Sequence, residues 1–172
     1  MLQIQPTRVE AEVSGTTHTA AVGSGPHRAL PLGPLEVALS ESTWPTYAWS
    51  VANRGDAAVA VRSVTLVFTV EAGAPPLRML RHGYQSWSPT GVATWGTDVD
   101  PTTRADVALL RAAHHADQRR VSRPGELRSE WVTLLADGSG GLLLAGFEAG
   151  TAHDGTFRLS PAGDGSGGTA AD

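Results

Sequence analysis

The chain has 172 residues, a formal net charge of −4 and a pI near 5.8. This length is typical of one domain, which can bury roughly 70% of the surface of its unfolded chain. The acidic balance provides no basic field for a polyphosphate, which argues against a nucleic-acid partner. The sequence has no cysteine, which excludes a disulfide framework and thiolate chemistry, and all 13 of its basic residues are arginine.

Targeting and metal-binding signals are missing from the sequence. The N-terminal segment "MLQIQPTRVEAEV" lacks the basic stretch and apolar stretch of a secretory signal. The longest apolar run, "GLLLAGF" at 141–147, is far shorter than the roughly 18 residues that span a bilayer. His114 and His115 are adjacent, so on a helix they would point about 100° apart, and no third ligand follows at a metal-site spacing. We therefore expect a cytoplasmic protein with no membrane partner, no cofactor and no metal.

Three segments in the first half have the alternating or continuous apolar positions of β-strands. They are "LEVAL" (35–39), "TYAWSVA" (46–52) and "AVAVRSVTLVFTVE" (58–71). Between the second and third lies "NRGD", in which Asn53 and Gly55 can take positive φ, so residues 46–71 are predicted to form a β-hairpin. The letters Arg-Gly-Asp also spell a cell-adhesion motif, but turn chemistry alone accounts for these residues.

The stretch "RHGYQSWSP" (81–89) concentrates aromatic and polar side chains in a chain that is otherwise poor in aromatics. Tyr84 and Trp87 are three positions apart, so they face opposite sides of an extended segment, and a turn brings them together. One interpretation makes both rings ordinary core aromatics, with Gln85 and Ser86 satisfying the backbone of a tight bend. The other is a binding site that meets both an apolar ring face and hydroxyl groups.

In the second half, only residues 100–120 have apolar positions near helical spacing, and a long irregular excursion fits them equally well. Two strands, at 131–136 and 141–149, flank "DGSGG" and are predicted to form a second hairpin. "TFRL" (156–159) is typical of one more strand, and 162–172 is a low-complexity tail or linker. Glu126 and Glu130 form a local carboxylate pair, which is no evidence for glycosidase chemistry because such carboxylates are usually far apart in sequence. The pattern as a whole predicts an all-β fold.

Two segments resemble the N-terminal domain of the α-galactosidases of glycoside hydrolase family 36, the melibiase-like enzymes. "HGYQSWSP" is similar to that domain's aromatic-Gln-Ser-Trp motif, in which Trp usually stands where this chain has Tyr84. "LRSEWVTLLADGSGGLLLAGFEAGTAHDGTFRL" (127–159) is similar to its later segment, where a Ser-acidic-aromatic strand enters a hairpin with a glycine tip. The resemblance covers most of residues 30–160. It implies a galactose-mutarotase-like antiparallel β-sandwich, or β-supersandwich, over residues 1–161, with its last strands and a following (β/α)8 barrel absent.

The resemblance also implies roles for the motif residues. Tyr84 is expected to project toward the barrel's active-site mouth and wall the galactose pocket, because the C–H face of a pyranose packs on a π face. Gln85, Ser86 and Trp87 are expected to shape and anchor the loop. No catalytic residue is assigned, because a barrel needs about 250 residues and the family's nucleophile lies in a Lys-x-Asp strand, whereas this chain has no lysine.

Two functions from different classes remain open. The first is the N-terminal β-sandwich portion of a retaining α-galactosidase, acting on terminal α-galactosides through the missing barrel and inert in hydrolysis without it. The alternative is a free-standing, non-catalytic β-sandwich that binds carbohydrate or another protein. In the first case, unpaired strand edges would favour self-association, so a homo-oligomer is left open.

Overall fold

A computed structural model describes residues 2–41, 46–83, 90–99, 125–148 and 155–161. All regular structure in these ranges is β, and the paired strands form antiparallel sheets, so the predicted all-β sandwich class is confirmed. None of the described residues belongs to a helix that is long and apolar enough to cross a membrane. Residues 162–172, the helix predicted within 100–120 and the His114–His115 pair lie outside the described residues.

The described strands form four sheets, ordered β2-β1-β6, β3-β4-β5, β11-β10-β7-β8 and β12-β9. They fall into two compact units, Ile4–Val70 and the remainder, and each is described by itself. The single domain expected over residues 1–161 stays a prediction. The strands are β1 (Gln3–Val13), β2 (Thr16–Ala21), β3 (His27–Leu32), β4 (Leu35–Glu41), β5 (Tyr47–Asn53), β6 (Val61–Glu71), β7 (Arg78–Arg81), β8 (Gly91–Thr94), β9 (Leu127–Glu130), β10 (Val132–Ala136), β11 (Leu142–Gly146) and β12 (Thr156–Leu159).

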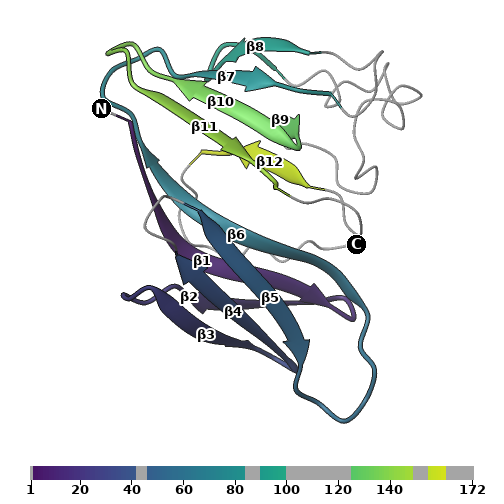
Figure 1. The fold of residues 1–172 in the computed structure, drawn as a ribbon. Coiled ribbons are helices and arrows are strands. Elements are labelled where there is room, and N and C mark those ends of the chain that lie inside the picture. The colour runs from purple at the N-terminus through teal and green to yellow at the C-terminus, as the bar shows by residue number, and fades with distance from the viewer. Residues whose placement is uncertain (1, 42–45, 84–89, 100–124, 149–154, 162–172) are drawn as a thin grey trace, which may run out of the picture. The chain divides into compact units, whose positions relative to one another are not determined.

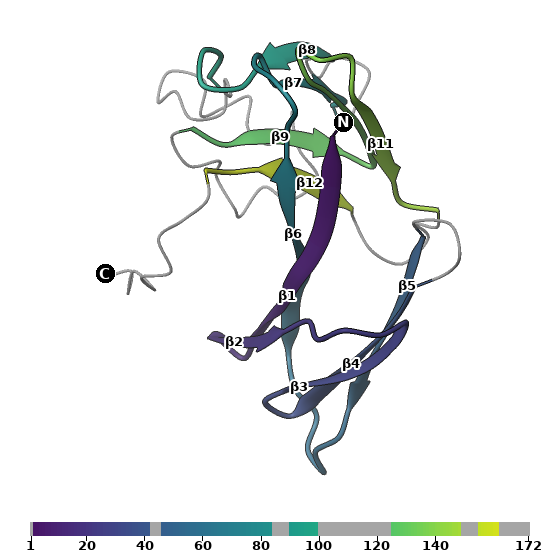
Figure 2. The same cartoon turned by 90° about the vertical axis from the view of Figure 1, so that its left-hand side faces the viewer.

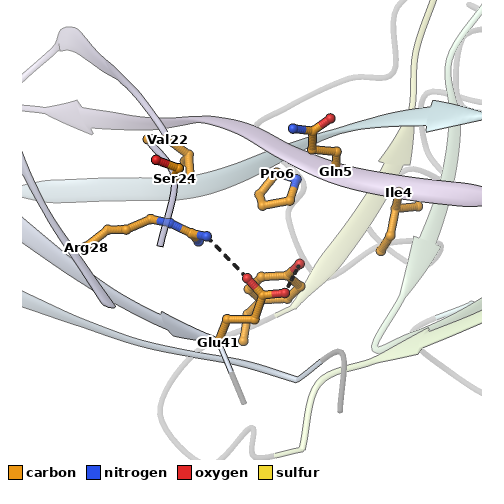
Figure 3. Close-up of a pocket in the computed structure, with 9 residues that line it drawn as sticks. Ile4, Gln5, Pro6, Val22, Ser24, Arg28 and Glu41 are labelled. Atoms are coloured by element: carbon orange, nitrogen blue, oxygen red, sulfur yellow. Dashed lines mark hydrogen bonds and ion pairs between the residues drawn. The ribbon is translucent and has the colours of Figure 1, made fainter. Parts of the chain in front are cut away.

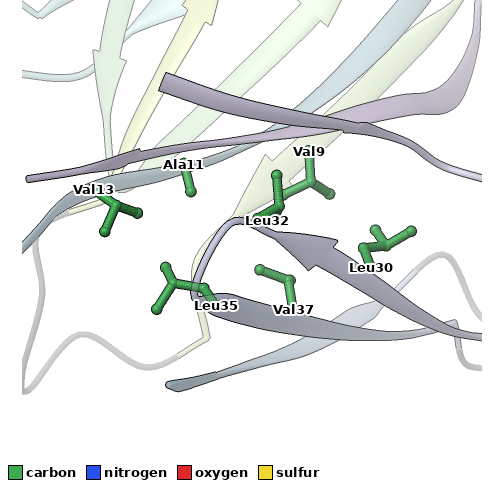
Figure 4. Close-up of a cluster of buried hydrophobic side chains, with 7 residues drawn as sticks. All are labelled: Val9, Ala11, Val13, Leu30, Leu32, Leu35 and Val37. Atoms are coloured by element: carbon green, nitrogen blue, oxygen red, sulfur yellow. The ribbon is translucent and has the colours of Figure 1, made fainter. Parts of the chain in front are cut away.

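The unit of residues 4–70 is a small β-sandwich made of the first two sheets (Figures 1 and 2). Alternate residues of β1 point into the space between the sheets and meet apolar side chains of β3 and β4 (Figure 4). Each buried Val or Leu side chain stabilises the fold by about 1.5–3 kcal/mol relative to leaving it in water. The buried cluster consists of Val9, Ala11, Val13, Leu30, Leu32, Leu35 and Val37.

The strands expected at 35–39, 46–52 and 58–71 are present, but the hairpin predicted for 46–71 is wrong. β5 pairs with β4, in a register that runs from Leu35↔Asn53 to Glu41↔Tyr47, whereas β6 joins β1 in the other sheet. The paired strands match in length: β5 and β4 both have 7 residues, and β6 and β1 both have 11. The connection between β5 and β6 therefore crosses from one sheet of the sandwich to the other.

The "NRGD" segment is a turn, as predicted, but it does not use positive φ at Asn53 or Gly55. Instead the Asn53 side chain closes the turn: its Oδ1 accepts a hydrogen bond from Gly55 N at 3.0 Å, and its Nδ2 donates to Ala57 O at 2.8 Å. Arg54 forms an exposed ion pair with Glu36, with 2.6 Å between Nη2 and Oε1. Turn chemistry and this pair account for the adhesion-like letters.

The second unit contains the predicted hairpin of β10 and β11, with "DGSGG" at its tip. The Asp137 carboxylate organises the tip by accepting hydrogen bonds from Ser139 Oγ and from the backbone amides of Ser139, Gly141 and Gly73. The last of these bonds ties the tip to the chain that follows β6. The hairpin prediction is therefore confirmed.

The strand expected at 131–136 begins one residue later, because Trp131 has a left-handed φ of 65°. A bulky residue rarely takes this conformation, which interrupts the extended backbone. The interruption separates β9, which pairs with β12, from β10, which belongs to the four-stranded sheet (Figure 2). The strand predicted at 156–159 is confirmed as β12.

Candidate functional site

The four residues expected to form and shape the sugar-facing loop, Tyr84, Gln85, Ser86 and Trp87, lie outside the described residues. Both ends of their loop are described. β7 leads into it and β8 leads out of it, and the two strands pair antiparallel up to Arg81↔Gly91. Beyond this pair, Gly83 N donates a hydrogen bond to Thr90 Oγ1 at 3.3 Å. The residues on both sides of the aromatic stretch therefore belong to one antiparallel strand pair of the four-stranded sheet.

The entry to this loop is attached to β9 at His82. Its backbone amide donates to Ser129 Oγ at 2.7 Å, and its carbonyl accepts from Glu130 N at 2.8 Å. His82 Nδ1 lies 3.1 Å from the carbonyl oxygen of Glu130, which can only accept, so this contact requires the Nδ1–H tautomer. These contacts join the two segments that carry the family resemblance, "HGYQSWSP" and "LRSEW".

The strand that receives His82 is buried along its whole length, although it carries charges. Arg128 and Glu130 are 1% and 0% exposed, and Arg128 Nη2 lies 3.3 Å from Glu130 Oε1. Glu130 Oε2 also accepts a hydrogen bond from Thr156 Oγ1 of β12 at 2.8 Å. Burying a charge is costly unless it is paired and hydrogen-bonded, so these contacts are what allow β9 to lie in the interior.

Two further contacts extend this polar network to its neighbours. Arg81 Nε, at the end of β7, donates to the backbone carbonyl of Arg128 at 3.1 Å. The buried carboxylate of Glu126 accepts a hydrogen bond from Ser160 Oγ at 3.0 Å. The last residue of β7 and the chain that follows β12 are thereby both tied to β9.

The Glu126 and Glu130 carboxylates do not form an accessible acid/base pair. Both are buried, each accepts a hydrogen bond from a hydroxyl group, and Arg128 stands between them along the strand. Within the described residues, no three His, Asp or Glu side chains are grouped closely enough to hold a metal ion. What this network can do is hold the base of the aromatic loop in one position.

An aromatic cluster lies next to Glu130. The Trp131 ring meets Phe147 edge-on at 6.2 Å, and Phe147 contacts Phe157 at 4.8 Å. The backbone of Trp131 is held on both sides, because its amide donates to Gly155 O and its carbonyl accepts from Phe147 N, each at 3.0 Å. A Cβ at Gly155 would overlap the Phe147 ring, so the cluster requires glycine there.

The four-stranded sheet has one buried face and one exposed apolar face. Met79, Ala93 and Leu135 are buried on the first. On the second, the register aligns one residue from each strand, in the order Leu144, Leu134, Leu80 and Val92, here called the apolar row. Its outer members Leu144 and Val92 are 70% and 65% exposed. The inner members Leu134 and Leu80 are half-buried, and a row of apolar side chains that is exposed at both ends is typical of an interaction surface.

No protein-family model, curated protein sequence or solved structure matches the chain. The α-galactosidase resemblance therefore rests on the sequence motifs alone.

Sequence patterns did not reveal that β9 is buried with its charges, or that the members of the apolar row share one face. In "ELRSE", every second residue is charged, with alternating sign. This pattern indicates that oppositely charged side chains lie on one face of a strand, where they can pair. β11 is a continuous apolar run, "LLLAG", and such a run does not tell which face of a sheet is covered.

Proposed function

We propose that the chain is the N-terminal β-sandwich portion of a retaining α-galactosidase, and that it presents Tyr84 to the galactose pocket of a (β/α)8 barrel domain. The sequence motifs suggest this function. The location is the cytoplasm, as expected from the sequence. Hydrolysis of terminal α-galactosides would be carried out by a carboxylate pair on the barrel, as the resemblance implies.

One observation carries the proposal: the apolar row includes a residue from each of β7 and β8, the strands that flank residues 84–89 in the chain. The pair Leu80↔Val92 is adjacent to Arg81↔Gly91, the last ladder pair before the loop. A domain that covers the row would therefore lie close to Arg81 and Gly91, the described ends of the strands that flank residues 84–89. The apolar row would supply binding energy, and the loop would supply a side chain to the active site.

The anchoring of His82 on β9 supports this division of labour. A residue that forms the wall of a sugar pocket has to be positioned accurately. A displacement of about 1 Å can lower the reaction rate about a hundredfold. Tyr84 offers a π face for the C–H face of a pyranose and a hydroxyl for a neighbouring polar group. Gln85, Ser86 and Trp87 would fix the shape of the loop above this anchor.

The test is reconstitution of activity. The chain is mixed with the polypeptide encoded immediately downstream of it, and the release of nitrophenol from p-nitrophenyl α-galactoside is measured. We expect activity from the mixture and none from the chain alone. Tyr84→Ala should lower kcat/KM without changing the melting temperature, whereas Trp87→Ala should lower stability by about 3–5 kcal/mol, the range for emptying a core aromatic site.

Three outcomes would contradict the proposal. Turnover by the chain alone that survives repurification would place catalysis within these residues. An unrelated downstream gene, or a mixture whose activity is indifferent to Tyr84→Ala, would favour a free-standing binding domain.

A further inference from the structure

The unit of residues 4–70 contains a cavity of about 300 Å³ at one end of its sandwich (Figure 3). Polar and apolar groups share its lining. Arg28 lines it from β3, Glu41 from the end of β4 and Tyr47 from the start of β5. Other lining residues include Pro6, Val22 and Ser24. In Figure 3, Pro6 lies on the Glu41 side of β1 and Gln5 on the opposite side.

Arg28 is a buried cation with unused hydrogen-bonding capacity. Its side chain is 10% exposed, and its Nη2 lies 3.2 Å from Glu41 Oε2. Its Nε and Nη1 are shut off from solvent and have no hydrogen-bond partner. A guanidinium carries five N–H donors, and buried donors without acceptors are costly, so this side chain is poised to gain from an added acceptor.

Glu41 provides the complementary capacity. Its Oε1 accepts a hydrogen bond from Tyr47 Oη at 3.4 Å, and its Oε2 accepts from Arg28, whereas a carboxylate offers about four acceptor sites. Burial, followed by the negative charge of Glu41, raises the pKa of Tyr47, so the phenol stays a donor. The Tyr47 ring is fixed edge-on against Phe68 at 5.3 Å.

We propose that this cavity binds a neutral, polyhydroxylated molecule of monosaccharide size. Arg28 has unused donors behind the cavity surface and Glu41 has unused acceptor sites, and a hydroxyl group satisfies both kinds because it donates and accepts. A second anion would be repelled by Glu41, and a cation would be repelled by Arg28. The volume is at the lower end of the roughly 300–1,000 Å³ range of ligand pockets, which favours one sugar ring over an oligosaccharide.

The apolar lining fits the same class of ligand. Pro6 and Val22 offer C–H surface on which the apolar face of a ring can pack, and Ser24 adds a hydroxyl. Because Nε and Nη1 of Arg28 are shut off from solvent, the guanidinium has to turn before either of these donors reaches a ligand oxygen. The site lies within one unit and uses no residue of the 84–89 loop, so it is independent of the proposed function.

The experiment follows the Nε–H signal of Arg28 in the NMR spectrum of the whole chain, assigned by its disappearance in Arg28→Gln. The probes are D-galactose, D-glucose and myo-inositol, with inorganic phosphate and citrate as the charged arms. We expect at least one neutral probe to shift the signal in a saturable way and both anions to leave it unchanged. A signal that responds to no neutral probe, or that responds more strongly to phosphate or citrate, would overturn the proposal.

Variants distinguish binding at this cavity from a nonspecific effect of removing a charge. Arg28→Gln and Glu41→Gln should each weaken sugar binding about tenfold or more, as expected for the loss of a charged hydrogen bond. Arg54→Gln and Glu36→Gln alter an exposed ion pair of the same unit and should bind like the wild type. Binding by all variants is read by saturation-transfer NMR, and folding is checked by circular dichroism.

The variants also decide the outcome if one of them is unstable. If Arg28→Gln does not fold, Glu41→Gln decides the matter, and wild-type affinity in that variant would contradict the proposal. Tyr84→Ala should leave sugar binding at this cavity intact. Loss of binding in Tyr84→Ala, with retention in Glu41→Gln, would place the sugar at the aromatic loop instead.

Discussion

The backbone amide of His82 donates a hydrogen bond to the hydroxyl of Ser129, with 2.7 Å between the nitrogen and Oγ. The two residues are 47 positions apart in the chain. The same hydroxyl donates to the carbonyl of Val132 at 2.5 Å, so Ser129 Oγ connects the base of the aromatic loop to the start of β10. Together with the two contacts of His82 to Glu130, this buried oxygen holds the chain where it enters residues 84–89.

Ser129→Ala should therefore lower the free energy of unfolding by about 1–3 kcal/mol, because it leaves the amide of His82 and the carbonyl of Val132 without their partner. Urea unfolding followed by fluorescence measures the loss. Ser40→Ala is the control, since Ser40 Oγ makes an exposed hydrogen bond to Ala48 O, and its effect should stay within about 0.5 kcal/mol. Equal effects of the two substitutions would show that the Ser129 hydroxyl anchors nothing.

Glu130→Gln should destabilise the chain far more than Glu36→Gln. The first removes the charge that faces Arg128 in the interior, and breaking one side of a buried ion pair typically costs about 3–5 kcal/mol. The second removes a charge from the exposed pair with Arg54, where such pairs contribute about 0–1 kcal/mol. Chemical denaturation of both variants at neutral pH provides the comparison. A loss below about 1 kcal/mol for Glu130→Gln would mean that the buried pair is dispensable.

The sequence predicts much of the strand content because local patterns determine it, but it does not predict which strands pair. Apolar runs, apolar alternation or β-branched composition predict β4, β5, β6, β10, β11 and β12. β2 escaped because "TTHTAA" contains no large apolar residue, and it is held in the sheet by its pairing with β1. The pairing of β5 with β4 rather than β6 depends on which sheet each strand completes, and no short window of sequence contains that information.

The candidate site, like the fold, has one part that the local sequence reveals and another that depends on tertiary contacts. The aromatic stretch with Tyr84 and Trp87 can be recognised locally, because its composition is unusual for this chain. Its anchor cannot be recognised locally, since Ser129 and Glu130 reach His82 only through the fold. The Arg28 cavity is hidden for the same reason: its cation, its carboxylate and its apolar wall come from different strands.

Asp137 should make stability depend on pH in the acid range. The Ser139 hydroxyl, and then the backbone amide of Gly73, lower the pKa of Asp137 to about 2, against an opposing effect of burial. Because the folded-state pKa lies below the unfolded value of about 3.9, the ionised carboxylate stabilises the fold above that value, and this contribution is lost as the pH falls toward 2. Asp137→Asn should therefore melt at a lower temperature than the wild type at pH 7, with the gap closing between about pH 5 and pH 2. A constant gap across this range, measured by circular dichroism, would contradict the assignment.

Gly138 should tolerate no side chain. A Cβ at this position would overlap the backbone carbonyl oxygen of Pro75, and the Gly138 amide donates to Ala74 O at 2.8 Å, so the backbone cannot easily move away. We expect Gly138→Ala to cost about 1–3 kcal/mol, the range for overpacking. Gly23→Ala is the matched control, because open space surrounds that position, and its effect should stay within about 0.5 kcal/mol. Differential scanning fluorimetry of the two variants is sufficient, and similar melting temperatures would be the contrary result.

The apolar row should cause the isolated chain to self-associate or to bind a hydrophobic dye. Leu144 and Val92 are exposed at opposite edges of the four-stranded sheet, and Leu134 and Leu80 continue the row between them. We expect the chain to bind a hydrophobic dye or to self-associate at micromolar concentration, because exposed apolar surface gains free energy when it is covered. Replacing Leu144 and Val92 together by Ser should abolish this behaviour while changing the free energy of unfolding by less than about 1 kcal/mol, since neither side chain is buried in the isolated chain. Val61→Ser, at an exposed valine of β6, removes apolar surface elsewhere and should leave association unchanged. A wild-type chain that is monomeric by light scattering and silent toward the dye would mean that the row needs no partner, and would remove the main structural support for a docked catalytic domain.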